Sequence, residues 1–578
     1  MGLSRGARRK VVLAGVALLA SAWVNGCGGD ANEDAAGRAP TNGGDGPFGG
    51  TGGSAGEAGM SANPGGGTGG TGGGAPLPPE MEVRVDFELP QASERYVFAA
   101  NPEGGTVSII DAETRHIQTL ETGERPTFLR TLAGTNDAIV LNVGSDDATI
   151  IRNPDGRATT SNVAVVRGAN AIAVAPDGVH AVVYFNASFS TAGNASGSLQ
   201  DVSVMKLDEG NDKVTDMTVG FRPRDVFFNG DGSAAFVVTE DGVSVLDFAE
   251  IEESGSGFAR GISLGNDIDQ KTLDVSVTPN GAFALARQPG DSQIRLVDLA
   301  SGVIERLDLA SLVSVAPGTG DEDAGVAPEP LPIEVTDLDL AESGTVAAAV
   351  LRNQSTLLVL PIPGAFQDPS QVVRHVIDDT VVGSAALAPN GKTALLYTTA
   401  AAVEHLTVVD LENASATPRT LVLRKTVRAV AIAPDSETAL VVHEKLEGNP
   451  NEPGIDPDLQ IDREFGYSVV SIASGAVKLQ TTQAMPGAFS VVPDGSAIFV
   501  LFRDDATALR EVQRIDTTSF LVEKFNLGSP PISIGAVPQS DSVFVSQDHP
   551  EGRITFIDWK SGEKNTVTGF ELNSRIRD

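Results

Sequence analysis

One segment sets the pattern for most of this chain: Ile172-Ala-Val-Ala-Pro-Asp-Gly-Val-His-Ala-Val-Val183. Proline presets φ near −65°, and Asp and Gly tolerate the positive φ that follows, so the segment predicts two antiparallel strands joined by a tight turn. The unit recurs about every 45 residues, which is the spacing of repeat architectures. Clear copies lie at 275–285, 385–391, 430–436 and 489–495, weaker ones at 228–232, 340–344 and 537–540, and degenerate ones near Gly134 and Pro90.

A second element follows the turn: an apolar strand that ends in aspartate. Its copies are Val107–Asp111, Val243–Asp247, Ile294–Asp298, Leu406–Asp410, Val512–Asp516 and Ile554–Asp558. We expect this aspartate to accept hydrogen bonds from backbone N–H groups two residues further on, as Asp298 would do before Ser301 and Gly302. A fourth apolar stretch is expected to lead into the next unit.

Four short strands per unit and about ten units predict an all-β fold, a β-propeller of four-stranded antiparallel blades. Regular spacing favours one ring of seven to ten blades over two smaller rings. An array of β-sandwiches is the alternative fold, but it does not explain so constant a repeat of two elements.

The Pro-Asp/Asn-Gly turn and the aspartate-terminated strand resemble the YVTN/WD40-like propeller superfamily over residues 85–575. The GH…WD signature of WD40 repeats is missing. Propeller quinoproteins carry repeated tryptophan docking motifs, whereas this chain has only Trp23 and Trp559. Propeller lactonases are similar at the level of the repeat, but none of their catalytic residues can be matched to a position here.

The N-terminus predicts an export signal, residues 1–26, with a basic region, an apolar run from Val11 to Val24 and a cleavage site. The run is too short to span a bilayer comfortably. Val24-Asn-Gly-Cys27 resembles the lipobox of bacterial lipoproteins, although Asn25 departs from the usual small residue. The resemblance implies diacylation of Cys27 and a lipid-anchored protein of the cell envelope. Gly28 favours the outer membrane, and an ordinary cleaved signal is the alternative.

Residues 27–84 are predicted to be a disordered tether that follows the lipidated cysteine. The tract Gly65–Gly74 has no apolar periodicity, so it cannot bury enough surface to offset its conformational entropy. Roughly fifty such residues reach about 40 Å. Gly52-Gly-Ser54-Ala-Gly56 matches the pattern of a serine-hydrolase nucleophile, but it lacks the strand and helix that a nucleophile elbow requires.

Composition argues against several classes of function. A net charge of −35 disfavours a nucleic-acid partner, and a single cysteine excludes cysteine-based zinc, iron–sulfur and haem sites. No catalytic, metal or cofactor-binding residue is predicted. The histidines lie in different repeats, and each is expected to have a surface or packing role: His116, His180, His375, His405, His443 and His549.

Three long insertions are the better places to look for binding, because loops on a rigid scaffold often carry it. They span residues 186–200, 316–332 and 444–464. The last contains Asp456, Asp458 and Asp462, which predict a solvated acidic loop, with a calcium site as the alternative.

The expected function is that of a non-catalytic binding or protein-interaction scaffold. Its partners would be the membrane, through the lipid on Cys27, and an envelope protein or extracellular ligand. Assembly into a larger envelope complex is a second possibility. A lactonase-like hydrolase with its site at the mouth of the axial channel is the enzymatic alternative, and it is less favoured.

Overall fold

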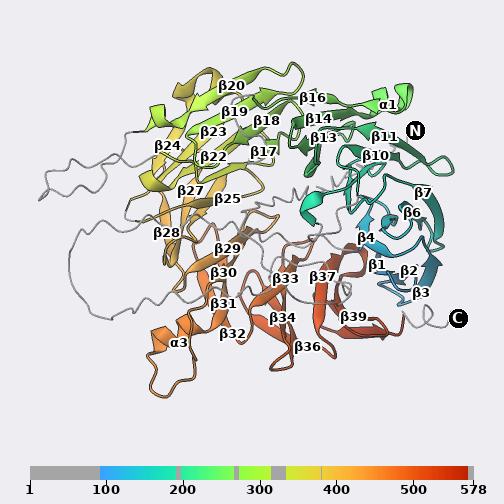
Figure 1. The fold of residues 1–578 in the computed structure, drawn as a ribbon. Helices are drawn as coiled ribbons and strands as arrows, with labels where there is room; N and C mark the ends of the chain where they lie inside the picture. The colour runs from blue at the N-terminus through green and yellow to red at the C-terminus, as the bar shows by residue number, and fades with distance from the viewer. Residues whose placement is uncertain (1–91, 190–196, 266–272, 314–332, 379, 571–578) are drawn as a thin grey trace, which may run out of the picture.

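The computed structural model describes residues 92–189, 197–265, 273–313, 333–378 and 380–570. These residues form ten sheets, antiparallel except for one added parallel strand, arranged as the blades of one closed ring (Figure 1). The all-β propeller prediction is therefore confirmed, and the blade number is ten. The signal, the tether, Cys27 and Ser54 lie outside the described residues, as do most of insertion 316–332 and part of insertion 186–200.

The first five blades follow the chain from its N-terminal side. Blade 1 is β1 (Tyr96–Asn101), β2 (Thr106–Asp111) and β3 (Ile117–Glu121); blade 2 is β4 (Pro126–Thr131), β5 (Ala138–Asn142), β6 (Asp147–Arg152) and β7 (Thr159–Ala164). Blade 3 is β8 (Ala171–Val174), β9 (His180–Tyr184), β10 (Asp201–Lys206) and β11 (Lys213–Thr218), with β15 (Gly257–Phe258) added; blade 4 is β12 (Asp225–Phe228), β13 (Ala234–Thr239), β14 (Gly242–Asp247) and β16 (Arg260–Ile262). Blade 5 is β17 (Asp274–Val277), β18 (Phe283–Arg287), β19 (Gln293–Asp298) and β20 (Ile304–Asp308).

The last five blades complete the ring. Blade 6 is β21 (Asp337–Leu340), β22 (Val346–Leu351), β23 (Thr356–Pro361) and β24 (Val373–Val376); blade 7 is β25 (Ser384–Leu387), β26 (Thr393–Tyr397), β27 (His405–Asp410) and β28 (Arg419–Val422). Blade 8 is β29 (Val427–Ile432), β30 (Thr438–His443), β31 (Phe465–Ser471) and β32 (Val477–Thr482); blade 9 is β33 (Pro486–Val491), β34 (Ala497–Asp504), β35 (Leu509–Asp516) and β36 (Val522–Asn526). Blade 10 is β37 (Pro531–Val537), β38 (Ser542–Gln547), β39 (Arg553–Asp558) and β40 (Lys564–Thr568).

Short helices interrupt the connections between strands. They are α1 (Phe248–Ser254), α2 (Gly364–Gln367), α3 (Pro457–Arg463) and the 3-10 turns η1 (Ala187–Phe189), η3 (Leu309–Leu312), η5 (Arg352–Gln354), η6 (Pro369–Gln371) and η7 (Pro538–Ser540). Within the described ranges, no helix has the length and apolar character needed to cross a bilayer.

Each complete blade runs from an inner strand to an outer strand, so its connections alternate between two ends. The inner turn, which joins the first and second strands, and the outer turn, which joins the third and fourth, lie at one end. We call this end of the ring the turn face. The connection between the second and third strands and the crossing to the next blade lie at the opposite end, the loop face.

The second and third strands carry the core. In blade 6 every residue of β22 except Val346 is buried, whereas in blade 2 the outer strand β7 has no buried residue. The expectation of a fourth apolar stretch is therefore wrong for outer strands such as β7 and β40. The outer strand pairs with another strand along one edge only, and its other edge faces water, so polar residues are tolerated there.

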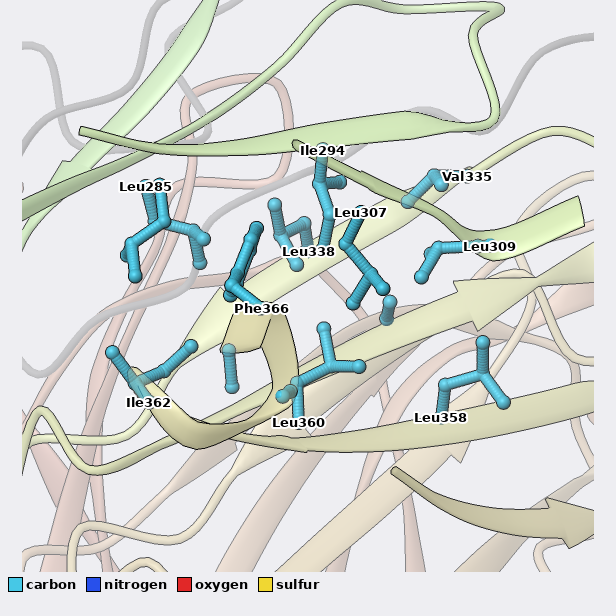
Figure 2. Packing of buried hydrophobic residues seen from close by; sticks show 14 of the residues in the cluster. Leu285, Ile294, Leu307, Leu309, Val335, Leu338, Leu358, Leu360, Ile362 and Phe366 are labelled. Carbon is cyan, nitrogen blue, oxygen red and sulfur yellow. The ribbon is translucent and has the colours of Figure 1, made fainter. Parts of the chain in front are cut away.

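Packing between neighbouring blades supplies the stability of the ring. Figure 2 shows one such layer, in which Leu285 and Ile294 of blade 5 meet Leu358 and Leu360 of blade 6. Burying each such side chain contributes about 1.5–3 kcal/mol, so every blade depends on both neighbours.

The ring closes where blade 10 meets blade 1. Val97 and Ile110 of blade 1 share a buried cluster with Phe544 and Phe556 of blade 10. The Arg115 guanidinium lies 4.1 Å from the centroid of the Phe556 ring. Chain segments more than 400 residues apart are thus joined by the same interblade packing that holds consecutive blades.

The aspartate predicted to cap the outer turn does so. Asp298 Oδ1 accepts from the backbone N–H groups of Ala300 at 3.0 Å and Ser301 at 2.7 Å. Equivalent bonds are formed by Asp111, Asp410, Asp516 and Asp558, while Asp247 caps the first turn of α1.

Candidate functional site

The inner turns of neighbouring blades touch one another around the turn face. Ser93 Oγ of blade 1 donates to Asn136 Oδ1 of blade 2 at 2.9 Å, and the Gln539 N–H of blade 10 donates to the Glu94 carbonyl of blade 1 at 2.9 Å. Further round, the Gly230 N–H donates to the Pro279 carbonyl at 2.6 Å. These contacts fix the spacing of the turns and therefore the shape of any cavity between them.

A cavity of about 500 Å³ opens on this face between blades 1 and 2. Its walls come from the inner and outer turns of both blades, and Gln539 of blade 10 closes one side. Among its lining side chains are the phenol of Tyr96 and the carboxamides of Gln118, Asn136 and Asn153. The Tyr96 hydroxyl lies against Gly156, where an added Cβ would be 2.8 Å from the oxygen.

Asn153 is the unusual residue of this cavity. It is only 1% exposed, and neither Nδ2 nor Oδ1 has a hydrogen-bond partner among the described residues. Its backbone N–H donates to Asp137 Oδ1 at 2.7 Å, so only the side-chain carboxamide lacks hydrogen-bond partners. A buried carboxamide without partners costs about 1–3 kcal/mol, which a bound molecule or water would recover.

The repeat shows what this position normally holds. In nine blades it directly follows the residue that pairs with the start of the second strand, and it is buried or partly buried. In blade 2 the pairing begins one residue later, with Ala138 opposite Ile151, and Asn153 is placed by the bond from its N–H to Asp137. The equivalents of Asn153 are Ala112, Leu207, Phe248, Leu299, Ile362, Leu411, Ile472, Thr517 and Trp559. Only blade 2 places a carboxamide here; eight of the other nine blades have an apolar residue and blade 9 has Thr517.

Two of the charged groups of the cavity, Arg95 and Asp111, form an ion pair, and the exposed carboxylate of Asp155 also lines the cavity. Arg95 donates to Asp111 Oδ2 from Nε at 3.1 Å and from Nη2 at 2.7 Å, and Arg95 Nη1 lies 3.0 Å from Glu113. Burial opposes ionisation of Asp111, but the bonds from Arg95 and from the N–H groups of Thr114 and Glu113 lower its pKa. Burial, followed by the charge of Asp111, raises the pKa of the Tyr96 phenol, so Tyr96 is a neutral donor and acceptor.

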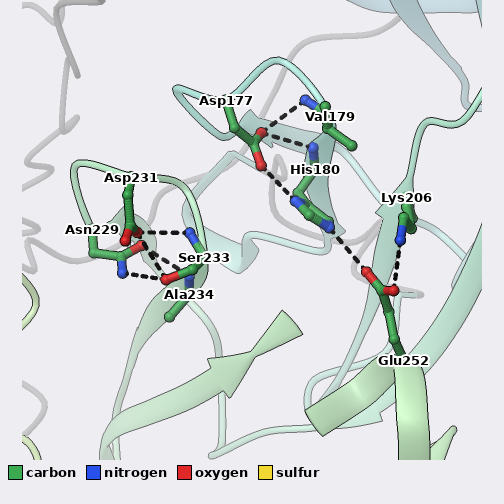
Figure 3. Close-up of polar contacts among 9 residues, drawn as sticks. All are labelled: Asp177, Val179, His180, Lys206, Asn229, Asp231, Ser233, Ala234 and Glu252. Atoms are coloured by element: carbon green, nitrogen blue, oxygen red, sulfur yellow. Dashed lines mark hydrogen bonds and ion pairs between the residues drawn. The ribbon is translucent and has the colours of Figure 1, made fainter. Parts of the chain in front are cut away.

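A second polar cluster joins blades 3 and 4 on the same face (Figure 3). His180 Nδ1 lies 2.6 Å from Asp177 Oδ2, its Nε2 lies 3.4 Å from Glu252 Oε1, and its ring stacks on Phe248 at 4.4 Å. Lys206 Nζ donates to the second oxygen of Glu252 at 2.6 Å and, with His180, lowers the pKa of that carboxyl. His180 and Lys206 of blade 3 thus both contact Glu252 of blade 4, so the cluster bridges the two blades.

Two other histidines are buried in strands. His443 is 1% exposed; its Nδ1 faces the Thr426 carbonyl at 3.1 Å and its Nε2 faces Ser468 Oγ at 2.7 Å. Burial lowers its pKa to about 4. The pairing resembles that of a nucleophile and a base, but Ser468 is completely buried and no substrate reaches it. Burial also lowers the pKa of His375.

The remaining histidines lie at edges and turns. His405 Nε2 lies 2.7 Å from Thr380 Oγ1, His549 Nδ1 accepts from the Glu551 N–H at 3.2 Å, and His116 is exposed at the rim of the cavity. His116 is therefore a surface residue that also lines the cavity, while the other five lie in strands, at edges or in the bridge between blades 3 and 4. The sequence context of His116 gave no sign of this position.

The acidic insertion 444–464 forms α3 on the loop face. Asp456 caps this helix by accepting from the Asp458 N–H at 2.9 Å. The ammonium of Lys425, which is 1% exposed, donates to the carbonyls of Ile461 at 2.7 Å and Asp462 at 3.0 Å at the other end. No group of three or more acidic, histidine or cysteine side chains gathers around a metal position anywhere in the described ranges, so the calcium alternative gains no support.

Comparison with known proteins finds similarity only among solved structures. No family model matches the chain, and no relative is found among curated proteins. A crystal structure described as the eukaryotic initiation factor aligns at 10% identity over 73% of this chain and 94% of its own, with a TM-score of 0.44.

Two further structures align less well. The C-terminal WD40 domain of Sif2 matches at 10% identity over 68% of this chain and 96% of its own, with a TM-score of 0.37. Apo AztD from Citrobacter koseri matches at 14% identity over 68% and 94%, with a TM-score of 0.36. These alignments are loose, so the fold assignment rests on the ten sheets themselves: the chain is a ten-bladed β-propeller.

Proposed function

We propose that this protein is a lipid-anchored component of the cell envelope whose propeller binds a ligand without transforming it. The observation that carries the proposal is the turn-face cavity, where a buried carboxamide has no partner. Unsatisfied polar groups converging in a preformed concave site are the usual mark of a binding site. The ligand is an envelope or extracellular molecule that reaches the open face of the ring.

The cavity supports binding more than hydrolysis. At this cavity, no hydrogen bond between described residues joins a hydroxyl to an imidazole, which is the pairing that activates a nucleophile. Asp111, the buried carboxylate, is held by Arg95 and two backbone N–H groups and is therefore a poor general base. These groups can orient a ligand, but they offer no activated nucleophile.

The experiment that separates binding from hydrolysis uses the full chain and a low-mass extract of the envelope. Compounds that the protein retains through dialysis are identified by mass spectrometry before and after incubation. We expect retained compounds to be recovered unchanged. Recovery of cleaved products would favour the lactonase-like alternative, and retention of nothing would refute the proposed function.

The anchor is tested separately through Cys27. Two or more acyl chains are needed for stable anchoring, and both depend on this residue. Cys27→Ser should abolish incorporation of radiolabelled palmitate and move the protein from the membrane pellet to the soluble fraction. Wild-type protein without label, or a Cys27→Ser protein that still pellets with membranes, would contradict the lipoprotein assignment.

A further inference from the structure

The charged residues that line the turn-face cavity limit the class of ligand that it can bind. Asp111 is engaged by Arg95 through two donors, and Glu113 binds the third nitrogen of the same guanidinium. Arg95 therefore offers no free cation to a ligand, whereas Asp155 adds an exposed carboxylate to the lining. An anionic ligand would have to compete with Asp111 and Glu113 for Arg95 and would be repelled by Asp155. An uncharged ligand leaves the ion pairs intact, and one of its hydroxyls can donate to the Asp155 carboxylate.

The unpartnered side-chain carboxamide of Asn153 places a second requirement on the ligand. The two polar atoms of Asn153 are a donor, Nδ2, and an acceptor, Oδ1, and both are buried without partners. A ligand that satisfies both must present an acceptor and a donor side by side. Each hydroxyl of a saccharide both donates and accepts, so adjacent hydroxyls on a sugar ring meet this requirement in either orientation.

The rest of the lining fits the same chemistry. Tyr96 supplies a neutral hydroxyl and an aromatic ring, and Asn136, whose amide oxygen accepts from Ser93, also lines the site. Apolar lining is limited, with Ile109 and Pro154 among the few such residues. A peptide would need buried pockets for apolar anchors, which this lining does not provide.

From these features we propose that the cavity between blades 1 and 2 binds an uncharged saccharide, with Asn153 as a direct ligand-binding residue. This inference rests on the proposed binding function and gives it a ligand class. It also explains why blade 2 departs from the repeat: the polar side chain is retained at a buried position because the bound sugar completes its hydrogen bonds.

The test uses the full chain carrying Cys27→Ser, so that no lipid is needed for solubility, on an array of neutral, sialylated and sulfated oligosaccharides and short peptides. The strongest neutral binder is then titrated by isothermal calorimetry. We expect binding to neutral oligosaccharides. Binding confined to acidic oligosaccharides or peptides, or no binding by folded protein, would overturn the proposal.

The decisive variant is Asn153→Leu, because blade 5 places Leu299 at the equivalent buried position. Leucine keeps the backbone bond to Asp137 and should leave the melting temperature unchanged or raised. Affinity should fall about tenfold or more, while Tyr96→Phe should weaken it about two- to tenfold. Asn565→Leu makes the same chemical change on the exposed outer strand β40 and should not alter affinity.

The outcomes separate this inference from the function on which it rests. Equal saccharide affinity in Asn153→Leu and wild type would remove the site assignment. Retention of an unmodified compound that is not a saccharide would leave the binding function in place and refute the ligand class. Loss of affinity in both Asn153→Leu and Asn565→Leu would show a general surface effect and would also count against the proposal.

Discussion

A pair of glycine substitutions measures how much the contacts between inner turns of neighbouring blades, which we call nested turns, contribute to the stability of the ring. Gly344, in the inner turn of blade 6, has a φ of +67° and is buried; a Cβ there would lie 2.5 Å from Cδ of Pro279 in the inner turn of blade 5. Gly134, in the inner turn of blade 2, has nearly the same φ, +70°, but no atom lies within 4 Å of its Cβ position. Gly134→Ala therefore isolates the backbone strain, and Gly344→Ala adds the contact between blades.

The expected magnitudes follow from the two terms. An alanine held at positive φ costs about 1 kcal/mol, which both variants share. The added methyl of Gly344→Ala meets a proline ring that cannot rotate away, and such overpacking costs about 1–3 kcal/mol. Gly134→Ala should thus lower the free energy of unfolding by about 1 kcal/mol, and Gly344→Ala by about 2–4 kcal/mol.

Urea unfolding of the full chain, followed by far-ultraviolet circular dichroism, provides the comparison, with m-values checked for equality because repeat proteins can lose cooperativity. The larger loss should belong to Gly344→Ala. Equal losses in the two variants would show that the inner turns of blades 5 and 6 do not press on one another, and the nested-turn description would be wrong.

Three further perturbations follow from buried side chains. His443 has a pKa of about 4 in the fold, and a histidine of the unfolded chain has one near 6.5, so the unfolded state binds more protons between these values. The free energy of unfolding should therefore fall by about 3 kcal/mol as pH drops from 6.5 to 4. His443→Gln should reduce this pH dependence, measured by urea titration at each pH. Lys425→Met should speed hydrogen exchange of residues 457–463 by leaving two carbonyls of α3 without their donor, with no such change elsewhere in blade 8. Phe556→Ala should lower the free energy of unfolding by about 3–5 kcal/mol because it empties the layer between blades 10 and 1, whereas Phe258→Ala, at a side chain that is 88% exposed, should change it by less than about 0.5 kcal/mol.

The repeat made the blades predictable because its signals are local. Proline, asparagine and glycine at 279–281 set one turn, and Asp298 sets the next, so the turn residues of each blade mark where its strands end. Even the degenerate turn near Gly134 corresponds to the inner turn of blade 2, while Pro90 lies outside the described residues. Outer strands such as β7 were predicted less well, because a half-exposed strand has no strict need for apolar residues.

The cavity could not be predicted in the same way because it depends on contacts between blades. Gln539 reaches blade 1 only when the ring closes, and no local pattern encodes that approach. One signal was nevertheless available: aligning the repeats places Asn153 in register with Leu299 and Trp559. A polar residue where the repeat calls for an apolar one marks a position at which folding alone does not explain the choice.

The central claim is that blade 10 closes on blade 1 and thereby builds the site, and a designed cross-link tests it most directly. The 2.9 Å hydrogen bond from the Gln539 N–H to the Glu94 carbonyl places the Cα atoms of these two residues about 5 Å apart, a separation that a disulfide spans. In a Cys27→Ser background, Glu94→Cys with Gln539→Cys should give an intramolecular disulfide in monomeric protein, seen as a reducible mobility shift. Glu94→Cys with Ser343→Cys, which lies across the ring, should not. Failure of the first pair to close, or equal closure of both pairs, would contradict the single closed ring.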